Sequence, residues 1–268
     1  MHPARIAELL EPFLVTPAAT NPCHSEPAKA GEEPTFLSPA QLQSISTYIN
    51  ILLRWNARIN LTAIRDPDQI VARHFGESLF AARHLFARTT PVGTAAPACP
   101  ELAEEPALRL PKGGCPAERS SAADGLRTAT EHISMADVGT GAGFPGLPIK
   151  LWAPHISLTL IESNQKKATF LREVARALTL TDVDIQTSRA EALTNANFDV
   201  VTLRAVESFE TILPVAASLV APGGCLALLI GLPQLEPARS ALPRFAWSNP
   251  EPIPLSRNRI LAIANRHL

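Results

Sequence analysis

The glycine-rich segment 136–150, with the sequence ADVGTGAGFPGLPIK, is the clearest indication of a ligand-binding site in the chain. Glycine allows tight turns and lets a ligand approach the backbone closely. A strand-like apolar run precedes the glycines and a helix follows them, so the loop ends at a helix N-terminus whose first N–H groups have no partner within the helix. We therefore expect this loop to bind a small-molecule cofactor.

Two cofactors are consistent with this loop. Residues 141–146 fit the GxGxxG pattern of a dinucleotide-binding fold, and Glu162 lies at a suitable distance in the sequence to bind a ribose. In the second interpretation Asp137 and the alternating glycines after it form the unit. A carboxylate beside the loop repels a pyrophosphate but suits the cationic S-adenosylmethionine, which we favour, and Glu162 then binds its ribose hydroxyls. The glycines of this unit are Gly139, Gly141 and Gly143.

The end of the fourth predicted strand indicates which atom would accept a methyl group. Enzymes that methylate exocyclic amines place an Asn/Asp-Pro-Pro-aromatic element there, whereas this chain has Leu203, Arg204 and Ala205. Methylation of a pyrimidine C5 needs a cysteine nucleophile, and Cys225 lies within a predicted strand. Guanine N7 has a free lone pair and no proton to remove, so its methylation needs only proximity, orientation and electrostatics.

Strand and helix patterns alternate from residue 135 to the end of the chain. This alternation predicts an α/β fold with a doubly wound, mainly parallel sheet that is covered on both faces and binds ligands at the carboxyl ends of its strands. The expected strands are 133–139, 157–163, 183–191, 198–206, 223–231 and 257–266, and the expected helices between them are 164–180 and 210–220.

Two amphipathic helices are predicted before this core. Ser38 and Gln41 form a capping box with Pro39 at the first helical position, and Asp66 begins a second helix after a polar turn. Two other stretches are rich in Pro, Ala, Gly and Ser without helical or strand periodicity. We therefore expect a flexible N-terminal extension (1–37), a helical element (38–86), a low-complexity insertion (87–134) and the cofactor-binding core (135–268).

The composition is that of a globular protein of 268 residues, with 46% hydrophobic residues and a net charge of −1. No apolar run approaches the ~20 residues of a membrane span, and no secretory signal is visible. The cysteines show no metal-type spacing, so we expect a cytoplasmic protein with reduced thiols, no metal site and no membrane partner. A nucleic acid would have to be bound through local basic patches. The cysteines are Cys23, Cys99, Cys115 and Cys225.

Five segments together resemble the RsmG family, also called GidB: LLRWNARINLTAIRDPDQIVARHFGESL, ADVGTGAGFPGLPIKLWAP, LIESNQKKATFLREV, RAEAL and FDVVTLRAV. The resemblance covers residues 38–86 and 135–231. Members of this family methylate guanine N7 at nucleotide 527 of bacterial 16S rRNA. The resemblance implies a class I S-adenosylmethionine-dependent methyltransferase fold (Rossmann-like) with an N-terminal helical element. It also implies 16S rRNA or the 30S subunit as the partner, and we expect a monomer.

Carried over position by position, the resemblance implies a set of site residues. Gly139 and Phe144 should touch S-adenosylmethionine in the loop, Ala190 and Glu191 should hold its adenine end, and Arg204 should line the site. A signature that faces the cleft comprises Trp55, Asn56, Asn60, Arg73 and His74. The expected cofactor-binding residues are Asp137, Gly139, Gly141, Gly143, Phe144, Glu162, Ala190, Glu191 and Arg204, and the expected catalytic residues are Asn60, His74 and Arg204.

The chain departs from the family pattern at two positions. Glu77 stands where the family has Asp, which preserves the charge, and Ile230 stands where the family has Lys before Gly231. The missing lysine would remove a cation from that edge of the site. This change leaves open a nonenzymatic RNA-binding protein that keeps the fold. The GxGxxG interpretation of the loop leaves open a dinucleotide-dependent oxidoreductase. Basic residues on the helix after the second strand either form a solvated face or contact RNA phosphates. These are Lys166, Lys167 and Arg172.

Overall fold

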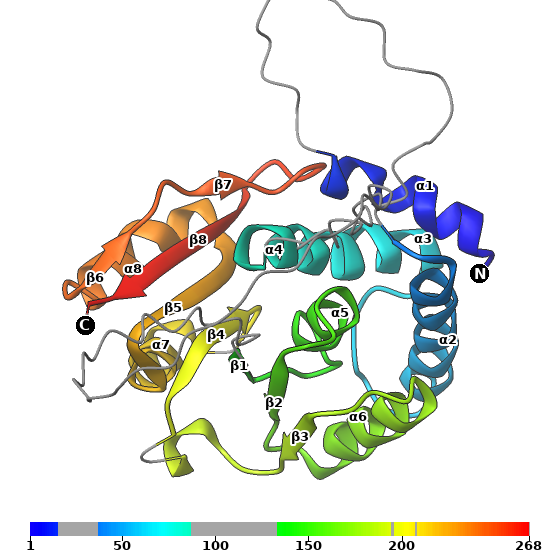
Figure 1. Cartoon of the computed structure of the whole chain (residues 1–268), viewed down its shortest axis with the longest axis horizontal. Coiled ribbons are helices and arrows are strands. Elements are labelled where there is room, and N and C mark those ends of the chain that lie inside the picture. The colour runs from blue at the N-terminus through cyan, green and yellow to red at the C-terminus, as the bar shows by residue number, and fades with distance from the viewer. Residues whose placement is uncertain (16–36, 87–132, 194–195, 207, 268) are drawn as a thin grey trace, which may run out of the picture. The chain divides into compact units, whose positions relative to one another are not determined.

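A single sheet lies at the centre of the structure, a computed structural model that describes residues 1–15, 37–86, 133–193, 196–206 and 208–267 (Figure 1). Its strands are β1 (Ser134–Val138), β2 (Ser157–Ile161), β3 (Val183–Gln186), β4 (Phe198–Arg204), β5 (Val220–Gly231), β6 (Phe245–Trp247), β7 (Glu251–Pro252) and β8 (Arg259–Arg266). The strand order is β3-β2-β1-β4-β5-β8-β6, and β7 pairs with β8.

The first five strands run parallel to one another, and the last three are antiparallel to their neighbours. This arrangement confirms the predicted α/β class with a doubly wound, mainly parallel sheet. Because chain order reverses direction on the two sides of β1, the carboxyl ends of β1 and β4 open onto the crevice where such sheets bind ligands. The glycine loop leaves β1 at this crevice.

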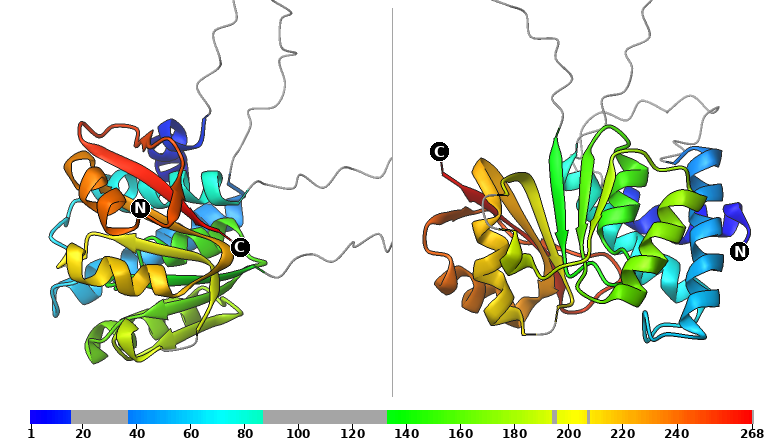
Figure 2. Two further views of the ribbon diagram at one scale, coloured as in Figure 1. Left: turned by 90° about the vertical axis from the view of Figure 1, so that its left-hand side faces the viewer. Right: turned by 90° about the horizontal axis from the view of Figure 1, so that it is seen from below.

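Helices cover both faces of the sheet (Figure 2). They are α1 (Pro3–Leu14), α2 (Pro39–Asn56), α3 (Pro67–Gln69), α4 (Glu77–Leu85), α5 (Gly146–Trp152), α6 (Gln165–Ala177), α7 (Phe209–Ser218) and α8 (Leu235–Ala241). Successive residues of a strand point to opposite faces. Met135 of β1 packs in the core with α2, α5 and α6, whereas Ala136 and Val138 pack in the core with α7 and α8.

The two predicted helices before the core are present. Ser38 and Gln41 form the capping box, and Asp66 caps the start of the second helix by accepting from Gln69 N. This second helix contains a π-helical turn (η1, Ile70–Gly76) between α3 and α4. Turns of this kind are frequent at functional sites. Here the turn carries His74 toward the crevice.

Helix α1 corrects the predicted extension. Residues 1–37 were expected to be flexible, but residues 3–14 form a helix whose apolar face is buried, with Ile6, Leu10 and Phe13 at most 1% exposed. The Phe13 ring lies so close to Gly76 that a Cβ there would stand 2.5 Å from it. The spacing of Ile6, Leu10 and Leu14 is a helical signal that the sequence analysis missed. The rest of the extension, residues 16–36, lies outside the described residues.

Other sequence predictions fall partly outside the structure. The insertion predicted for 87–134 lies outside the described residues except for its last two positions. Of the cysteines, Cys225 is described, and it is a free thiol on β5. Helix α8 and strands β6 and β7 were not predicted, because each is short and carries little periodicity. Among the described helices, none is long and apolar enough to cross a membrane.

Candidate active site

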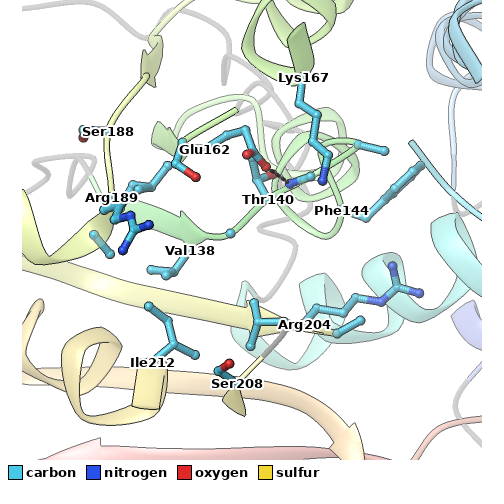
Figure 3. A pocket seen from close by; sticks show the side chains of 18 of the residues that line it. Val138, Thr140, Phe144, Glu162, Lys167, Ser188, Arg189, Arg204, Ser208 and Ile212 are labelled. Atoms are coloured by element: carbon cyan, nitrogen blue, oxygen red, sulfur yellow. Dashed lines mark hydrogen bonds between the residues drawn. The ribbon is translucent and has the colours of Figure 1, made fainter. Parts of the chain in front are cut away.

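A cavity of about 660 Å³ opens at the carboxyl ends of β1, β2 and β4 (Figure 3). Its volume falls in the range of sites that bind small molecules and cofactors. Segments far apart in the sequence form its wall: the glycine loop, the end of β2, the 3-10 turn η2 (Ala190–Ala192), the end of β4 and the polar turn before α3. Of the predicted cofactor residues, these line it: Gly139, Gly141, Phe144, Glu162, Ala190, Glu191 and Arg204.

The glycine loop needs glycine for two different reasons. Gly139 has a φ of +66°, and a Cβ there would lie 2.8 Å from Val206 Cγ1, so a side chain would be strained and would also crowd the loop after β4. Gly143 has a φ of +86°, but a Cβ there would lie 2.3 Å from the Tyr48 hydroxyl. Gly143 therefore does not line the cavity. It allows the loop to pack tightly against α2.

Asp137 holds the loop from beneath. Its carboxylate is fully buried and accepts hydrogen bonds from Thr140 Oγ1 at 2.6 Å, Gly146 N at 3.0 Å and Thr202 Oγ1 at 2.9 Å. Burial raises the pKa of Asp137 to about 6, although these hydrogen bonds oppose the shift. Asp137 is absent from the cavity wall, so the direct cofactor contact predicted for it is replaced by a role in fixing the loop.

Glu162 faces the cavity from the end of β2. It is 7% exposed, its Oε2 accepts from Gly141 N at 3.0 Å, and its Oε1 accepts from Asn164 N at 2.8 Å (Figure 3). A carboxylate oxygen has two lone pairs, so each oxygen keeps capacity for a ligand hydroxyl. The two backbone bonds fix the orientation of the carboxylate before any ligand arrives.

Basic side chains that the sequence analysis did not assign to the cofactor pocket also line the cavity. Lys167 reaches it from α6, and Arg189 reaches it from the segment before η2 (Figure 3). Lys167 belongs to the basic stripe for which RNA contact was one alternative. Arg172 of the same stripe donates to Thr187 Oγ1 at 2.8 Å. The helical spacing of the stripe located Lys167 on α6, but only the packing of α6 beside β2 brings it to the cavity.

Arg204 links the core to the helical element. Its guanidinium, 8% exposed, donates to Glu77 Oε2 at 2.9 Å, to the Arg73 carbonyl at 2.8 Å and to His74 Nδ1 at 3.2 Å. In Figure 3 the side chain extends from the end of β4 toward the helix drawn in teal. Arg204 therefore lines the cavity and also belongs to a buried ion pair, which compensates its charge in this apolar environment.

The partners of His74 fix its tautomer. An arginine only donates, so Nδ1 of His74 accepts from Arg204, and the ring proton is on Nε2, which lies 2.8 Å from Thr62 Oγ1. Burial and then the positive charges of Arg204, Arg73 and Arg259 lower the pKa of His74 to about 3. His74 is therefore a neutral ring at physiological pH, with neither nitrogen free to take a proton.

Aromatic rings continue from His74 into the core. His74 stacks on Phe144 at 4.7 Å between ring centroids, and Phe144 stacks on Tyr48 at 5.4 Å. The Tyr48 hydroxyl donates to the Ala142 carbonyl in the glycine loop. The helical element is thereby joined to the cofactor loop by rings as well as by the Arg204 ion pair. Tyr48 is the single tyrosine of the chain, yet its position on a buried helix face gave no sign of this contact.

The comparisons with known proteins decide the family. Residues 41–96 and 121–248 match the family described as GidB, rRNA small subunit methyltransferase G. The chain belongs to this family. A ribosomal RNA small subunit methyltransferase G from Stenotrophomonas maltophilia (strain R551-3) is 36% identical over 222 residues, which cover 82% of each chain. One from Xanthomonas axonopodis pv. citri (strain 306) is 34% identical over 240 residues, covering 89% of this chain and 91% of that protein.

Among solved structures, a ribosomal protein L11 methylase from Lactobacillus delbrueckii subsp. bulgaricus is 21% identical with a TM-score of 0.44, covering 53% of this chain and 74% of that chain. Membership in the family makes the chain a class I, S-adenosylmethionine-dependent rRNA methyltransferase. The dinucleotide interpretation of the glycine loop is therefore wrong, and with it the oxidoreductase alternative.

The family's N-terminal signature is only partly in the cavity wall. His74 lines the cavity, but Asn60 is exposed and is absent from the wall. Asn56 is buried, and its side chain bonds the backbone of Leu61 and Thr62, which places Thr62 against His74. The Trp55 indole donates to Glu173 at 2.8 Å. Catalysis by Asn60 stays a prediction, whereas Asn56 acts by ordering the turn.

The end of β5, where this chain has Ile230 and the family has a lysine, does have a cation beside it. Ile230 is 4% exposed and packs in the core with α7 and α8. Arg259 pairs with Gly231 across β5 and β8, and its Nη2 lies 3.0 Å from Glu77 Oε2. The expected loss of positive charge at this edge is therefore corrected, because the antiparallel neighbour β8 supplies an arginine.

Proposed function

We propose that the protein methylates guanine N7 of 16S rRNA, at nucleotide 527 by family resemblance, by direct in-line displacement. The observation that carries the proposal is that no thiol lies in the part of the cavity wall that the structure describes and that the ring nitrogens of His74 are both engaged, while the carboxylates of this wall, Glu162 and Glu191, are the residues proposed to bind the cofactor. Both nitrogens of His74 are engaged, and Cys225 is in β5, where burial raises its thiol pKa to about 11. An acceptor that must first lose a proton would find neither a free histidine nor a thiolate in this described part of the wall to take that proton.

The residues of the cavity fit S-adenosylmethionine. We propose that Glu162 holds the ribose hydroxyls, that Ala190 and Glu191 lie at the adenine end, and that Gly139 allows the backbone to approach the ligand. The bound cofactor supplies an electrophilic methyl group attached to a sulfonium. The fixed Glu162 carboxylate and the preformed glycine loop position the ligand without reorganisation, which is where the protein lowers the barrier.

The target guanine would enter between the glycine loop and the end of β4. The neutral His74 ring, which stacks on Phe144 and lines the cavity, lies there, and stacking on aromatic rings is a common way of holding an unpaired RNA base. Methylation leaves the guanine ring cationic, and aromatic faces favour a cation. A protonated His74 would repel this product, so the low pKa of His74 serves the reaction.

Methyl transfer from labelled S-adenosylmethionine tests the proposal. We expect label in 16S rRNA of 30S subunits from cells that lack the gene, and N7-methylguanine at a single position by mass spectrometry. The variant Gly139→Asp should transfer no label, because φ is +66° and Val206 blocks a side chain. Free 16S rRNA and assembling particles, run in parallel, identify the substrate form.

Three results would contradict the proposal. Label on another guanine atom or on another base would refute N7 methylation. Labelled rRNA from the Gly139→Asp variant would refute the placement of the cofactor at the loop. Tight binding of 30S subunits with no label under any condition would favour the nonenzymatic RNA-binding alternative. Calorimetry with S-adenosylmethionine alone shows whether the purified chain is competent to bind the donor.

A further inference from the structure

A second, smaller cavity adjoins the active site. It has a volume of about 60 Å³, and it shares with the large cavity the segment 204–206 at the end of β4. Its other wall is formed by the end of β5, by Gln234 in the 3-10 turn η3 (Leu232–Gln234) and by Arg259 at the start of β8. A space of this size accommodates about two water molecules, or one small polar group.

Positive charge exceeds negative charge around this cavity. Glu77 is 3% exposed, and its Oε2 is shared by Arg204 at 2.9 Å and by Arg259 at 3.0 Å. His74 is neutral because it accepts from Arg204. Two buried or half-buried guanidinium groups therefore face one carboxylate. Burial lowers the pKa of Arg259, Glu77 opposes this shift, and the positive charges of Arg204 and Arg73 add to it. An anion in the small cavity would relieve this excess.

Arg259 also has a donor that is not used. Its Nη2 donates to Glu77 and lies 3.5 Å from the Leu229 carbonyl, but its Nε is buried and has no hydrogen-bond partner among the described residues. A buried donor without an acceptor is destabilising, so an acceptor that reached Arg259 Nε would be held there. Gln234 Oε1 accepts from Gly231 N at 3.0 Å, and Arg259 Nε makes no hydrogen bond to this oxygen.

We propose that the small cavity binds one phosphate group of the substrate RNA, and that Arg259 is the residue that holds it. A phosphate supplies several strong acceptor oxygens, and a guanidinium bonds such oxygens in pairs. The small cavity borders the site where the target base would enter. A backbone phosphate next to that base would therefore lie near the small cavity. The inference rests on the proposed function, because it takes RNA as the substrate.

The test measures binding of 30S subunits to the full chain as a function of salt. Each phosphate contact contributes roughly 0.7–0.9 to the slope of log affinity against log salt concentration. We expect Arg259→Gln to reduce the slope by about one contact and to raise the KM for 30S subunits roughly tenfold. The kcat and the calorimetric affinity for S-adenosylmethionine should change little. The matched control is Arg244→Gln, which removes an exposed arginine near the other end of β8, where Phe245 pairs with Arg266.

Two further variants separate phosphate binding from a structural role of the Glu77 pair. Arg259→Lys keeps the charge and should recover most of the slope. Gln234→Glu leaves Arg259 and Glu77 intact but adds a negative charge to the cavity wall, and it should weaken RNA binding even if Arg259→Gln proves poorly folded. A salt slope for both Arg259→Gln and Gln234→Glu equal to that of wild type would overturn the proposal. Because the slope needs no methyl transfer, this result is distinct from a failure of the proposed function, in which no label reaches the rRNA.

Discussion

Single residues in the active site act through their partners rather than alone. Arg204 illustrates this, because one guanidinium joins the Glu77 carboxylate, the Arg73 carbonyl and the His74 ring. Removing one partner of a buried ion pair leaves an uncompensated charge, which costs about 3–5 kcal/mol. Glu77 is therefore more than a substitute for the family's Asp: its carboxylate binds arginines from both β4 and β8.

The neutral His74 should make the protein sensitive to acid. Its pKa is about 3 in the folded protein and 6.5 for an unperturbed ring, so below pH 6.5 only the unfolded state takes up the proton. The folded state should lose about 2 kcal/mol between pH 6.5 and pH 5 through this group. We expect His74→Gln, whose carbonyl still accepts from Arg204, to show a smaller loss of unfolding free energy between pH 7 and pH 5 in urea denaturation.

Asp137 provides the opposite sign in the same experiment. Its folded pKa of about 6 lies above the unfolded value of 3.8, so its contribution is present below pH 3.8 and is lost as pH rises through 6. Wild type and His74→Gln share this contribution of Asp137 to stability, so it cancels when the acid dependence of the two proteins is compared. An equal acid dependence in both proteins would show that His74 is charged or exposed after all.

Glu162 should determine the affinity for S-adenosylmethionine. Glu162→Gln keeps the size of the side chain but removes the charge, and the ribose hydroxyls would lose a charged acceptor. Hydrogen bonds to charged groups contribute about 1.5–3 kcal/mol, so we expect binding about 10- to 100-fold weaker by calorimetry. The control is Glu236→Gln, an exposed carboxylate on α8. Unchanged affinity for Glu162→Gln would remove Glu162 from the cofactor site.

At the scale of elements, the helices before the core are part of the site and not an appendage. Tyr48 of α2 bonds the glycine loop, the π-helical turn presents His74, and α4 carries the Glu77 that holds Arg204. Helix α1 supports this arrangement from behind, because Phe13 packs directly on Gly76. A disturbance of α1 should therefore reach the active site through the π-helical turn.

Truncating the buried face of α1 tests this role. Leu10 is fully buried, and replacing a buried leucine by alanine typically costs about 2–5 kcal/mol. We expect Leu10→Ala to lower the free energy of unfolding by an amount in this range, measured by urea denaturation. The neighbouring exposed Glu11 provides the control, and Glu11→Ala should change stability by less than about 0.5 kcal/mol. Equal stability of the two variants would mean that α1 is not docked in solution.

At the scale of the whole molecule, the family match divides into two parts. It covers residues 41–96 and 121–248, and the residues between them fall outside it. We predict that deleting residues 89–129, which comprise this unmatched segment and the adjoining ends of both matched parts, leaves the melting temperature within a few degrees of wild type and the affinity for S-adenosylmethionine unchanged. Differential scanning calorimetry and titration of the shortened chain measure both. A large drop in melting temperature would show that the segment is needed for the fold.

Local patterns predicted most of the core before any contact was known. The strands end and the helices begin where apolar periodicity and caps place them, so Gly139, Glu162 and Arg204 were correctly expected to share one end of the sheet. Helix α1 was missed because its three apolar repeats stand in a short segment next to a proline-rich stretch. Its stability comes mainly from packing against η1, α2 and α4 and not from helix propensity alone.

The sequence by itself determined most of the elements, the α/β class with a mainly parallel sheet and the family to which the chain belongs. These depend on periodicity, turn chemistry and motifs, which are local properties. Only the tertiary structure decided which charges meet. Asp137 lies beneath the glycine loop and not in the cavity wall. Arg259 lies at the edge where this chain has Ile230 in place of the family's lysine. The Asp137–Thr202 hydrogen bond and the Arg259–Glu77 ion pair join residues more than fifty positions apart, and their energies depend on burial and on distances that no local pattern encodes.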